Sequence, residues 1–159
     1  REKLTKDLGF TREDRNKNIE RNTFVATLLT QNDIVTLCSF ISPYQRARNY
    51  ARKEIEKVGG FIEVFVNAPL KVCEKRDVKG LYQQAREGKI DNFTGISDPY
   101  EEPQNPDLEL RTDKEDVGES ALKVIRYLEN EGYISVITEE VEKKDEDIIK
   151  ERLSGLGYI

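Results

Sequence analysis

Two short apolar runs, each followed by a segment with helical character, constrain the fold of this chain more than any other feature. Residues 34–40 (IVTLCSF) and 61–66 (FIEVFV) are rich in β-branched and aromatic residues, a composition typical of strands buried on both faces. The helical segment after the first run ends at Gly59-Gly60. Strands that alternate with helices form parallel sheets, because each helix carries the chain back to the same edge. The pattern predicts an α/β fold with these two strands parallel and side by side or nearly so.

Five helices and a third strand are expected around these two runs. The helices are predicted at residues 12–31, 44–58, 69–76, 81–87 and 116–131. Thr11 and Asp14 resemble a capping box, with Asp in place of Glu, at the start of the first helix. Pro69 suits the first turn of the third helix because that position needs no backbone N–H. With a short strand at 108–111, the prediction is a parallel sheet flanked by helices.

A polar segment at residues 77–106 interrupts the alternation of strands and helices. It contains several glycines and three of the five prolines. Long irregular segments in compact domains are usually functional or disordered, and we interpret this one as a lid-like loop. Residues 1–134 are expected to form one domain, and residues 135–159, which include a charge run, a C-terminal appendage.

The composition argues against several classes of protein. A net charge of −5 argues against a general nucleic-acid binder, and no apolar run approaches the roughly 18 residues of a membrane span. The absence of His removes the usual general base. Cys38 and Cys73, without His, would make a poor zinc site. We interpret them as buried, unpaired thiols in a reducing compartment and expect a cytoplasmic protein with no nucleic-acid or membrane partner.

Three motifs are expected where ligands bind in parallel sheets, beyond the carboxyl ends of the strands. They are FISPY at 40–44, RDVKGLY at 76–82 and FTG at 93–95. Each has a simpler interpretation. Ser42 could be a turn residue before Pro43, Arg76 and Lys79 could be solvated surface charges, and Phe93 could anchor its loop to the core.

One face of the first helix repeats polar residues at a spacing of three. These residues are Arg12, Arg15, Asn18 and Arg21. The simpler interpretation is a solvated face. As a site, the face would present guanidinium groups and an amide to an anion from one side.

Together these motifs resemble the adenylylsulfate (APS) kinase family over about residues 1–134. Gly9-Phe10, Asp14-Arg15, Asn18-Ile19, FISPY, RDVKGLY, FTG and PYE at 99–101 occur in the family's order. The resemblance implies a P-loop nucleoside-kinase-like fold. It also implies a transferase that moves a phosphoryl group from ATP with Mg²⁺ to the 3′-hydroxyl of APS, giving PAPS in sulfate assimilation.

The resemblance also implies the residues of the site. The APS site would consist of Arg1, Phe10, Arg15, Asn18, Ile41, Ser42, Lys79, Leu81 and Phe93, and Arg76 would lie on the ATP side.

Each implied role is physically reasonable. Phe10 and Phe93 would sandwich the APS adenine between flat faces. Arg15 and Asn18, with Arg1, would bind the phosphosulfate. Among the remaining residues of the set, Ile41 and Ser42 would lie beside the reacting centre, and Lys79 and Leu81 would belong to the lid over the substrate, with Ser42 and Lys79 as the catalytic residues. Phosphoryl transfer depends on positioning and on neutralising charge, which suits a chain without His.

One part of the family pattern is missing from the sequence. The 159 residues contain no P-loop, G-x-x-x-x-G-K-[ST], and no Asp-Gly-Asp-Asn run ahead of Arg1. We therefore expect a longer parent protein to supply the first strand, the P-loop helix and most ligands of ATP and Mg²⁺, and the chain alone to be inactive. The alternatives are a degenerate APS-kinase-like domain that regulates by binding a nucleotide, or a non-kinase structural domain. The resemblance further implies a homodimer, with fusion to or association with ATP sulfurylase as a further arrangement.

Overall fold

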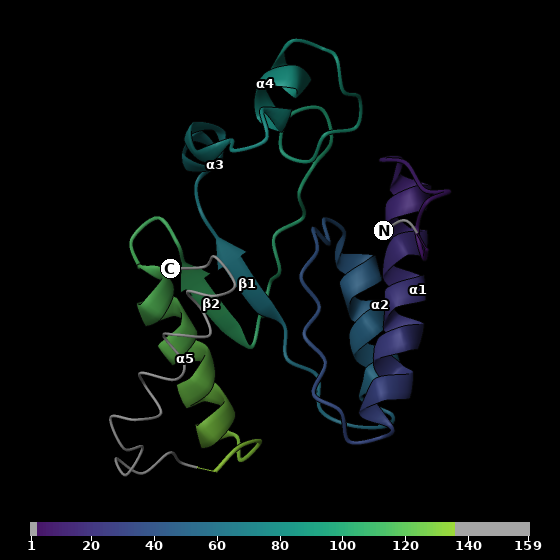
Figure 1. The fold of residues 1–159 in the computed structure, drawn as a ribbon, viewed down its shortest axis with the longest axis vertical. Coiled ribbons are helices and arrows are strands. Elements are labelled where there is room, and N and C mark those ends of the chain that lie inside the picture. The colour runs from purple at the N-terminus through teal and green to yellow at the C-terminus, as the bar shows by residue number, and fades with distance from the viewer. Residues whose placement is uncertain (1–2, 136–159) are drawn as a thin grey trace. The chain divides into compact units, whose positions relative to one another are not determined.

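The computed structural model describes residues 3–135, within which there are five helices and two strands (Figure 1). The elements are α1 (Arg12–Thr30), α2 (Gln45–Ile55), β1 (Val64–Asn67), α3 (Leu70–Arg76), α4 (Leu81–Arg86), β2 (Leu108–Arg111) and α5 (Val117–Asn130). All five predicted helices are present, with ends within about three residues of the prediction. No helix of the described range is long and apolar enough to cross a membrane.

The chain divides into two compact units, Arg1–Ser120 and Ala121–Ile159. The first unit contains every predicted site residue. The predicted appendage at 135–159 lies, apart from its first residue, outside the described residues.

The two strands form a parallel pair, as Figure 1 shows. Val64 lies opposite Leu108, and the register continues to Asn67 opposite Arg111. Phe65 and Leu110 are the buried residues of the pair, and because they are one register position apart, they point to opposite faces of the sheet. The strand predicted at 108–111 is confirmed, and the strand predicted at 61–66 is observed over its second half.

The strand predicted at 34–40 does not form. Val35 and Leu37 are each 90% exposed, and among the described residues the sheet consists of β1 and β2 alone. A strand requires a hydrogen-bonded neighbour, and apolar composition reports only a preference for burial. The expected pairing of 34–40 with 61–66 was therefore wrong, since β1 pairs with β2 instead. Cys38, in this run, is exposed rather than buried, and Cys73 is half-buried; both are unpaired.

Helices α1 and α2 lie side by side through small residues (Figure 1). Ile19 of α1 forms a buried cluster with Ala47 and Ala51 of α2, and Phe61 packs against it. The two alanines allow the helix backbones to approach closely, so the N-terminal turns of both helices are held in one body with the segment that leads to β1.

Candidate functional site

The N-terminus of α1 is capped in the manner that the sequence predicts. The Asp14 backbone N–H donates to Thr11 Oγ1 at 3.1 Å, and the Thr11 hydroxyl donates to Asp14 Oδ2 at 2.8 Å. The first bond satisfies one backbone donor of the helix that would otherwise lack a partner, and the second holds the two side chains together. The cap fixes the start of α1, and with it the positions of Phe10 just before the helix and of Arg15 in its first turn.

Arg15 brings two distant predicted residues together. Its Nε donates to the Phe10 carbonyl at 3.1 Å, and its Nη2 donates to the Asn92 carbonyl at 3.1 Å. The guanidinium carbon also lies 5.5 Å from the centroid of the Phe10 ring. Because Phe93 follows Asn92, this one side chain joins the segments that carry both predicted adenine-stacking residues.

Asn18 lies one turn further along α1 and is half-buried. Its side-chain oxygen accepts a hydrogen bond from Nδ2 of Asn22 at 3.1 Å. Since an amide carries both donors and an acceptor, this bond leaves its own Nδ2 group as a donor for a ligand on the Arg15 side of the helix.

A compact turn holds Phe93 in place. Its carbonyl accepts N–H groups from Ile96, Ser97 and Asp98 at 3.0 to 3.1 Å, and its own N–H donates to Ser97 Oγ at 2.9 Å. The Phe93 ring meets the Tyr82 ring edge-on, with centroids 5.0 Å apart and planes at 75°. Phe93 is half-buried, so its simpler role as a loop anchor and its predicted role as a stacking face are both compatible with its surroundings.

The RDVKGLY motif forms the turn between α3 and α4. The Asp77 carboxylate accepts the backbone N–H groups of Leu81 at 2.8 Å and Gln83 at 3.0 Å, so it caps α4. Desolvation opposes ionisation of Asp77, but these backbone donors outweigh it and lower the pKa of the carboxyl. Gly80 takes a positive φ of 63°, which completes the turn. Val78, between these anchors, is 96% exposed.

The three charged or apolar residues predicted around this turn differ in their contacts. Lys79 is exposed at the tip, and Leu81 is 38% exposed at the start of α4. Arg76 instead reaches past the end of β2, where Nη1 donates to Thr112 Oγ1 at 3.2 Å and Nη2 donates to the Thr112 carbonyl. Arg76 therefore ties the base of the turn to the sheet, while Lys79 extends from its tip.

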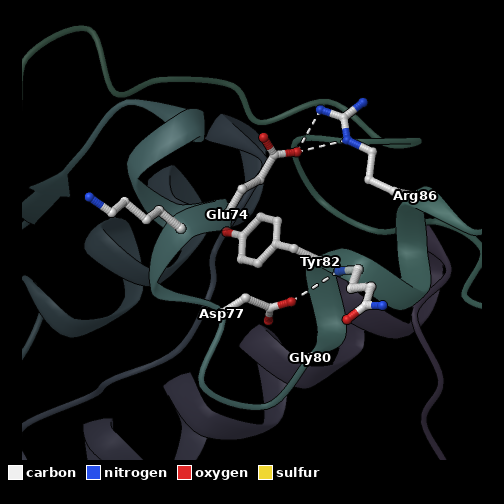
Figure 2. A pocket seen from close by; sticks show the side chains of 7 residues that line it. Glu74, Asp77, Gly80, Tyr82 and Arg86 are labelled. Atoms are coloured by element: carbon white, nitrogen blue, oxygen red, sulfur yellow. Dashed lines mark hydrogen bonds and ion pairs between the residues drawn. The ribbon is translucent and has the colours of Figure 1, made fainter.

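Residues of α3, of α4 and of the turn between them line an open pocket of about 510 Å³, shown in Figure 2. The lining residues are Glu74, Lys75, Asp77, Gly80, Tyr82, Gln83 and Arg86. Glu74 and Arg86 pair with each other at 2.6 Å, and the Asp77 carboxylate is used to cap α4. Partial burial, together with the neighbouring Cys73, raises the pKa of Tyr82. The pocket contains none of the predicted site residues.

The FISPY motif ends in a buried anchor. Pro43 and Tyr44 are among the most buried side chains in the structure, and the Tyr44 hydroxyl donates to the Asp98 carboxylate. Burial, and secondarily this hydrogen bond, raises the pKa of Tyr44. Ile41 is 58% exposed and Ser42 is half-buried, so both precede the anchor at the surface. The anchor joins the FISPY turn to the loop that carries Phe93.

Glu101 links the PYE segment to the starts of both α1 and α2. Its carboxylate accepts the Gln45 N–H at 2.8 Å and pairs with Arg12 Nη2 at 2.5 Å. Its backbone N–H donates to the Pro43 carbonyl at 2.8 Å. The Arg12 guanidinium also lies 4.3 Å from the centroid of the Tyr44 ring. The predicted polar face of α1 is therefore partly used to hold the motif segments together.

The structure thus gathers Phe10, Arg15 and Phe93 and connects them to the FISPY turn through the loop before Glu101. The predicted residue Arg1 lies outside the described residues. Sequence motifs did not reveal the contacts of Asn92, Asp98 and Glu101, because each contact joins segments far apart in the chain.

Residues 3–135 contain no group of three or more His, Cys, Asp or Glu side chains arranged to hold a metal ion. Mg²⁺ requires several oxygen ligands in a near-octahedral arrangement. In nucleotide sites this ion keeps several waters and is held by one or two carboxylates together with the phosphates, so the described residues do not form a complete Mg²⁺ site by themselves.

The similarity of the chain to known proteins agrees with this arrangement. A family model described as adenylylsulphate kinase matches residues 1–111, more than half of the chain. The chain belongs to the adenylylsulfate kinase family. An adenylyl-sulfate kinase of Halothermothrix orenii is 74% identical over 136 residues, which are 86% of this chain and 72% of the relative. The family resemblance found in the motifs is confirmed.

Solved structures of adenylylsulfate kinases share the fold. The APS kinase of Mycobacterium tuberculosis in complex with AMPPNP and APS matches with a TM-score of 0.78 and 46% identity, over 81% of this chain and 75% of that chain. A hexameric APS kinase from Thiobacillus denitrificans matches with a TM-score of 0.62 and 30% identity, over 84% of this chain and 22% of that chain. The predicted α/β fold of the P-loop kinase type is confirmed.

Proposed function

We propose that the protein containing this chain is an adenylylsulfate kinase that transfers the γ-phosphoryl group of ATP to the 3′-hydroxyl of APS, giving PAPS. The observation that carries the proposal is the position of Arg15, which holds the Phe10 and Asn92 carbonyls and so joins the two predicted adenine-stacking segments. The solved relative that binds APS and AMPPNP has the same fold, which supports both substrates.

The adenine of APS would lie between the rings of Phe10 and Phe93. An aromatic sandwich binds a flat base through both faces. Phe10 is 41% exposed and Phe93 half-buried, so each ring has surface available for a base. The Tyr82 ring supports Phe93 from its edge, which would leave a face of Phe93 for stacking.

The phosphosulfate of APS would be bound by Arg15 and Asn18, with Arg1. A guanidinium has five N–H donors, and the two hydrogen bonds of Arg15 to carbonyl oxygens leave others for an anion. Arg15 would then have two functions: it would bind the substrate anion and keep the Phe93 loop in place.

Lys79 and Ser42 would act on the reacting groups, with Ile41 and Leu81 beside them and Arg76 on the ATP side. Lys79 lies at the exposed tip of a turn that is anchored on both sides by Asp77 and Gly80. A charged tip on an anchored turn can close over a substrate and exclude water, which otherwise competes with the 3′-hydroxyl. The sequence contains no G-x-x-x-x-G-K-[ST] motif, so no residue of this chain is assigned to the β- and γ-phosphates of ATP.

The remaining partners follow from the family. We propose a homodimer in the cytoplasm, with fusion to or association with ATP sulfurylase as a further arrangement. That one relative of this fold, the APS kinase of Thiobacillus denitrificans, is hexameric supports an oligomeric assembly.

Two measurements on separate samples test this function. The full-length protein, incubated with ATP, Mg²⁺ and APS, should form PAPS, detected by anion-exchange chromatography. The 159-residue chain, once circular dichroism shows that it is folded, should bind APS weakly in calorimetry. Binding without turnover by the full-length protein would instead support the regulatory nucleotide-binding domain.

A further inference from the structure

Arg48 on α2 is a buried arginine that the proposed chemistry does not use. Only 8% of its surface is exposed. Its Nη1 donates to the Ser42 carbonyl at 2.7 Å, and its Nη2 donates to the Glu101 carbonyl at 2.6 Å. Its Nε pairs with Glu63 Oε1 at 2.7 Å, just before β1. One planar group thus contacts three separate segments.

Two of these segments carry or border the proposed site. Ser42 belongs to the FISPY turn, and Glu101 follows the loop that carries Phe93. The same two segments also meet through the hydrogen bond from the Glu101 N–H to the Pro43 carbonyl at 2.8 Å. Arg48 lies at this junction and holds one carbonyl from each side. A planar guanidinium can donate in two fixed directions at once, whereas an ammonium is a point charge on a flexible stem.

We propose that Arg48 is a positioning residue for phosphoryl transfer: it fixes the backbone of Ser42 relative to the segment that returns from the Phe93 loop. This inference rests on the proposed kinase function. Displacing a group at a reacting centre by about 1 Å can cost about 100-fold in rate even when the substituted residue is remote from the chemistry. The role therefore predicts a loss of kcat that exceeds any loss of stability.

Arg52 provides a matched control one turn further along α2. It pairs with the same Glu63 at 3.7 Å, and also with Asp107 and Glu56. Its contacts lie on the strand side of the network rather than on Ser42 and Glu101. A substitution of Arg52 therefore disturbs the same buried ion-pair network without touching the FISPY turn.

The test compares Arg48→Lys with Arg52→Lys in the full-length protein. Melting temperatures are measured first, and kcat and the KM values for APS and ATP are then measured well below both melting transitions. We expect both variants to have lower melting temperatures than wild type. We expect only Arg48→Lys to lower kcat, by about 10- to 100-fold. Equal kcat values for the two variants would overturn the positioning role. A wild-type protein that forms no PAPS would instead refute the proposed function itself.

A second variant covers the case in which Arg48→Lys does not fold. Arg48→Met combined with Glu63→Gln removes the buried ion pair as a whole, so no unpaired charge remains to oppose folding. The double variant should fold and show the same loss of kcat, with Glu63→Gln alone close to wild type in kcat. Retention of kcat by the double variant would contradict the proposal.

Discussion

Arg15 and Asn92 are 77 residues apart in the sequence, yet Nη2 of Arg15 donates to the Asn92 carbonyl at 3.1 Å. The contact joins the first turn of α1 to the loop that carries Phe93. Because Arg15 also donates to the Phe10 carbonyl, one side chain holds both segments that carry the predicted stacking residues.

Replacing Arg15 should weaken APS binding through the loss of a charged donor. Arg15→Ala should cost about 1.5–3 kcal/mol of APS binding free energy, the range for hydrogen bonds to charged groups. Arg15→Lys should recover only part of this, because an ammonium cannot hold two carbonyls and an anion in a fork geometry. Calorimetric titration with APS measures both. Arg126→Ala, on α5, is the control, and an equal loss from it would point to diffuse electrostatic attraction.

Replacing Phe93 should separate stacking from packing. If the ring stacks on adenine, Phe93→Ala should raise the KM for APS about 5- to 150-fold, on the scale of base–aromatic stacking, and leave the KM for ATP unchanged. Phe93→Tyr should be nearly silent because the ring face remains. Steady-state kinetics with melting curves measure the effect.

Tyr82→Leu is the comparison for the Phe93 variants, since it removes the edge-on contact but keeps the Phe93 ring. It should lower stability with little change in the KM for APS. If Phe93→Ala and Tyr82→Leu behave alike, the Phe93 ring has only a packing role.

Gly59 approaches the end of α1 so closely that any side chain should destabilise the fold. A Cβ at this position would lie 2.5 Å from Cγ2 of Thr30. Gly59→Ala should therefore lower the free energy of unfolding by about 1–3 kcal/mol, the range for overpacking. Urea denaturation measures the loss. The double variant Gly59→Ala with Thr30→Ser lacks the clashing methyl group and should recover most of it; no recovery would place the cause elsewhere.

The ion pair between Asp7 and Arg21 should make stability depend on pH in the acid range. Arg21 contacts both carboxylate oxygens at 2.6 and 2.7 Å, and its hydrogen bonds lower the pKa of Asp7 from 3.8 to about 2. A carboxyl with a lowered folded-state pKa contributes stability above its unfolded pKa and loses it as the pH falls through the folded value. The contribution should therefore be complete above pH 3.8 and disappear toward pH 2.

Asp7→Asn isolates this contribution because it removes the charge and keeps the shape. Urea unfolding at several pH values should show wild type more stable than Asp7→Asn near neutrality, with the difference shrinking between about pH 4 and pH 2. A difference that is constant across this range would show that the pair does not titrate as described.

The sequence alone determined the elements whose signals are local. Helix ends depend on caps and breakers within a few residues, so Thr11 with Asp14 and the Gly59-Gly60 pair placed the limits of α1 and α2 closely. Ordered motifs likewise identified the family, because FISPY, RDVKGLY and FTG are contiguous in the chain. The roles of Phe10, Arg15 and Phe93 remain predictions from that resemblance.

Tertiary structure alone decided which segments meet. Residues 34–40 have the composition of a strand but no paired neighbour among the described residues, and a β-ladder needs two segments in register, which no single segment encodes. The role proposed for Arg48 could not be predicted from the sequence either, because its contact with Glu101 joins residues 53 positions apart. Interactions within a few residues determine where helices and turns form. The contacts of a buried charge depend instead on which carbonyl groups from distant segments lie near it in the folded protein.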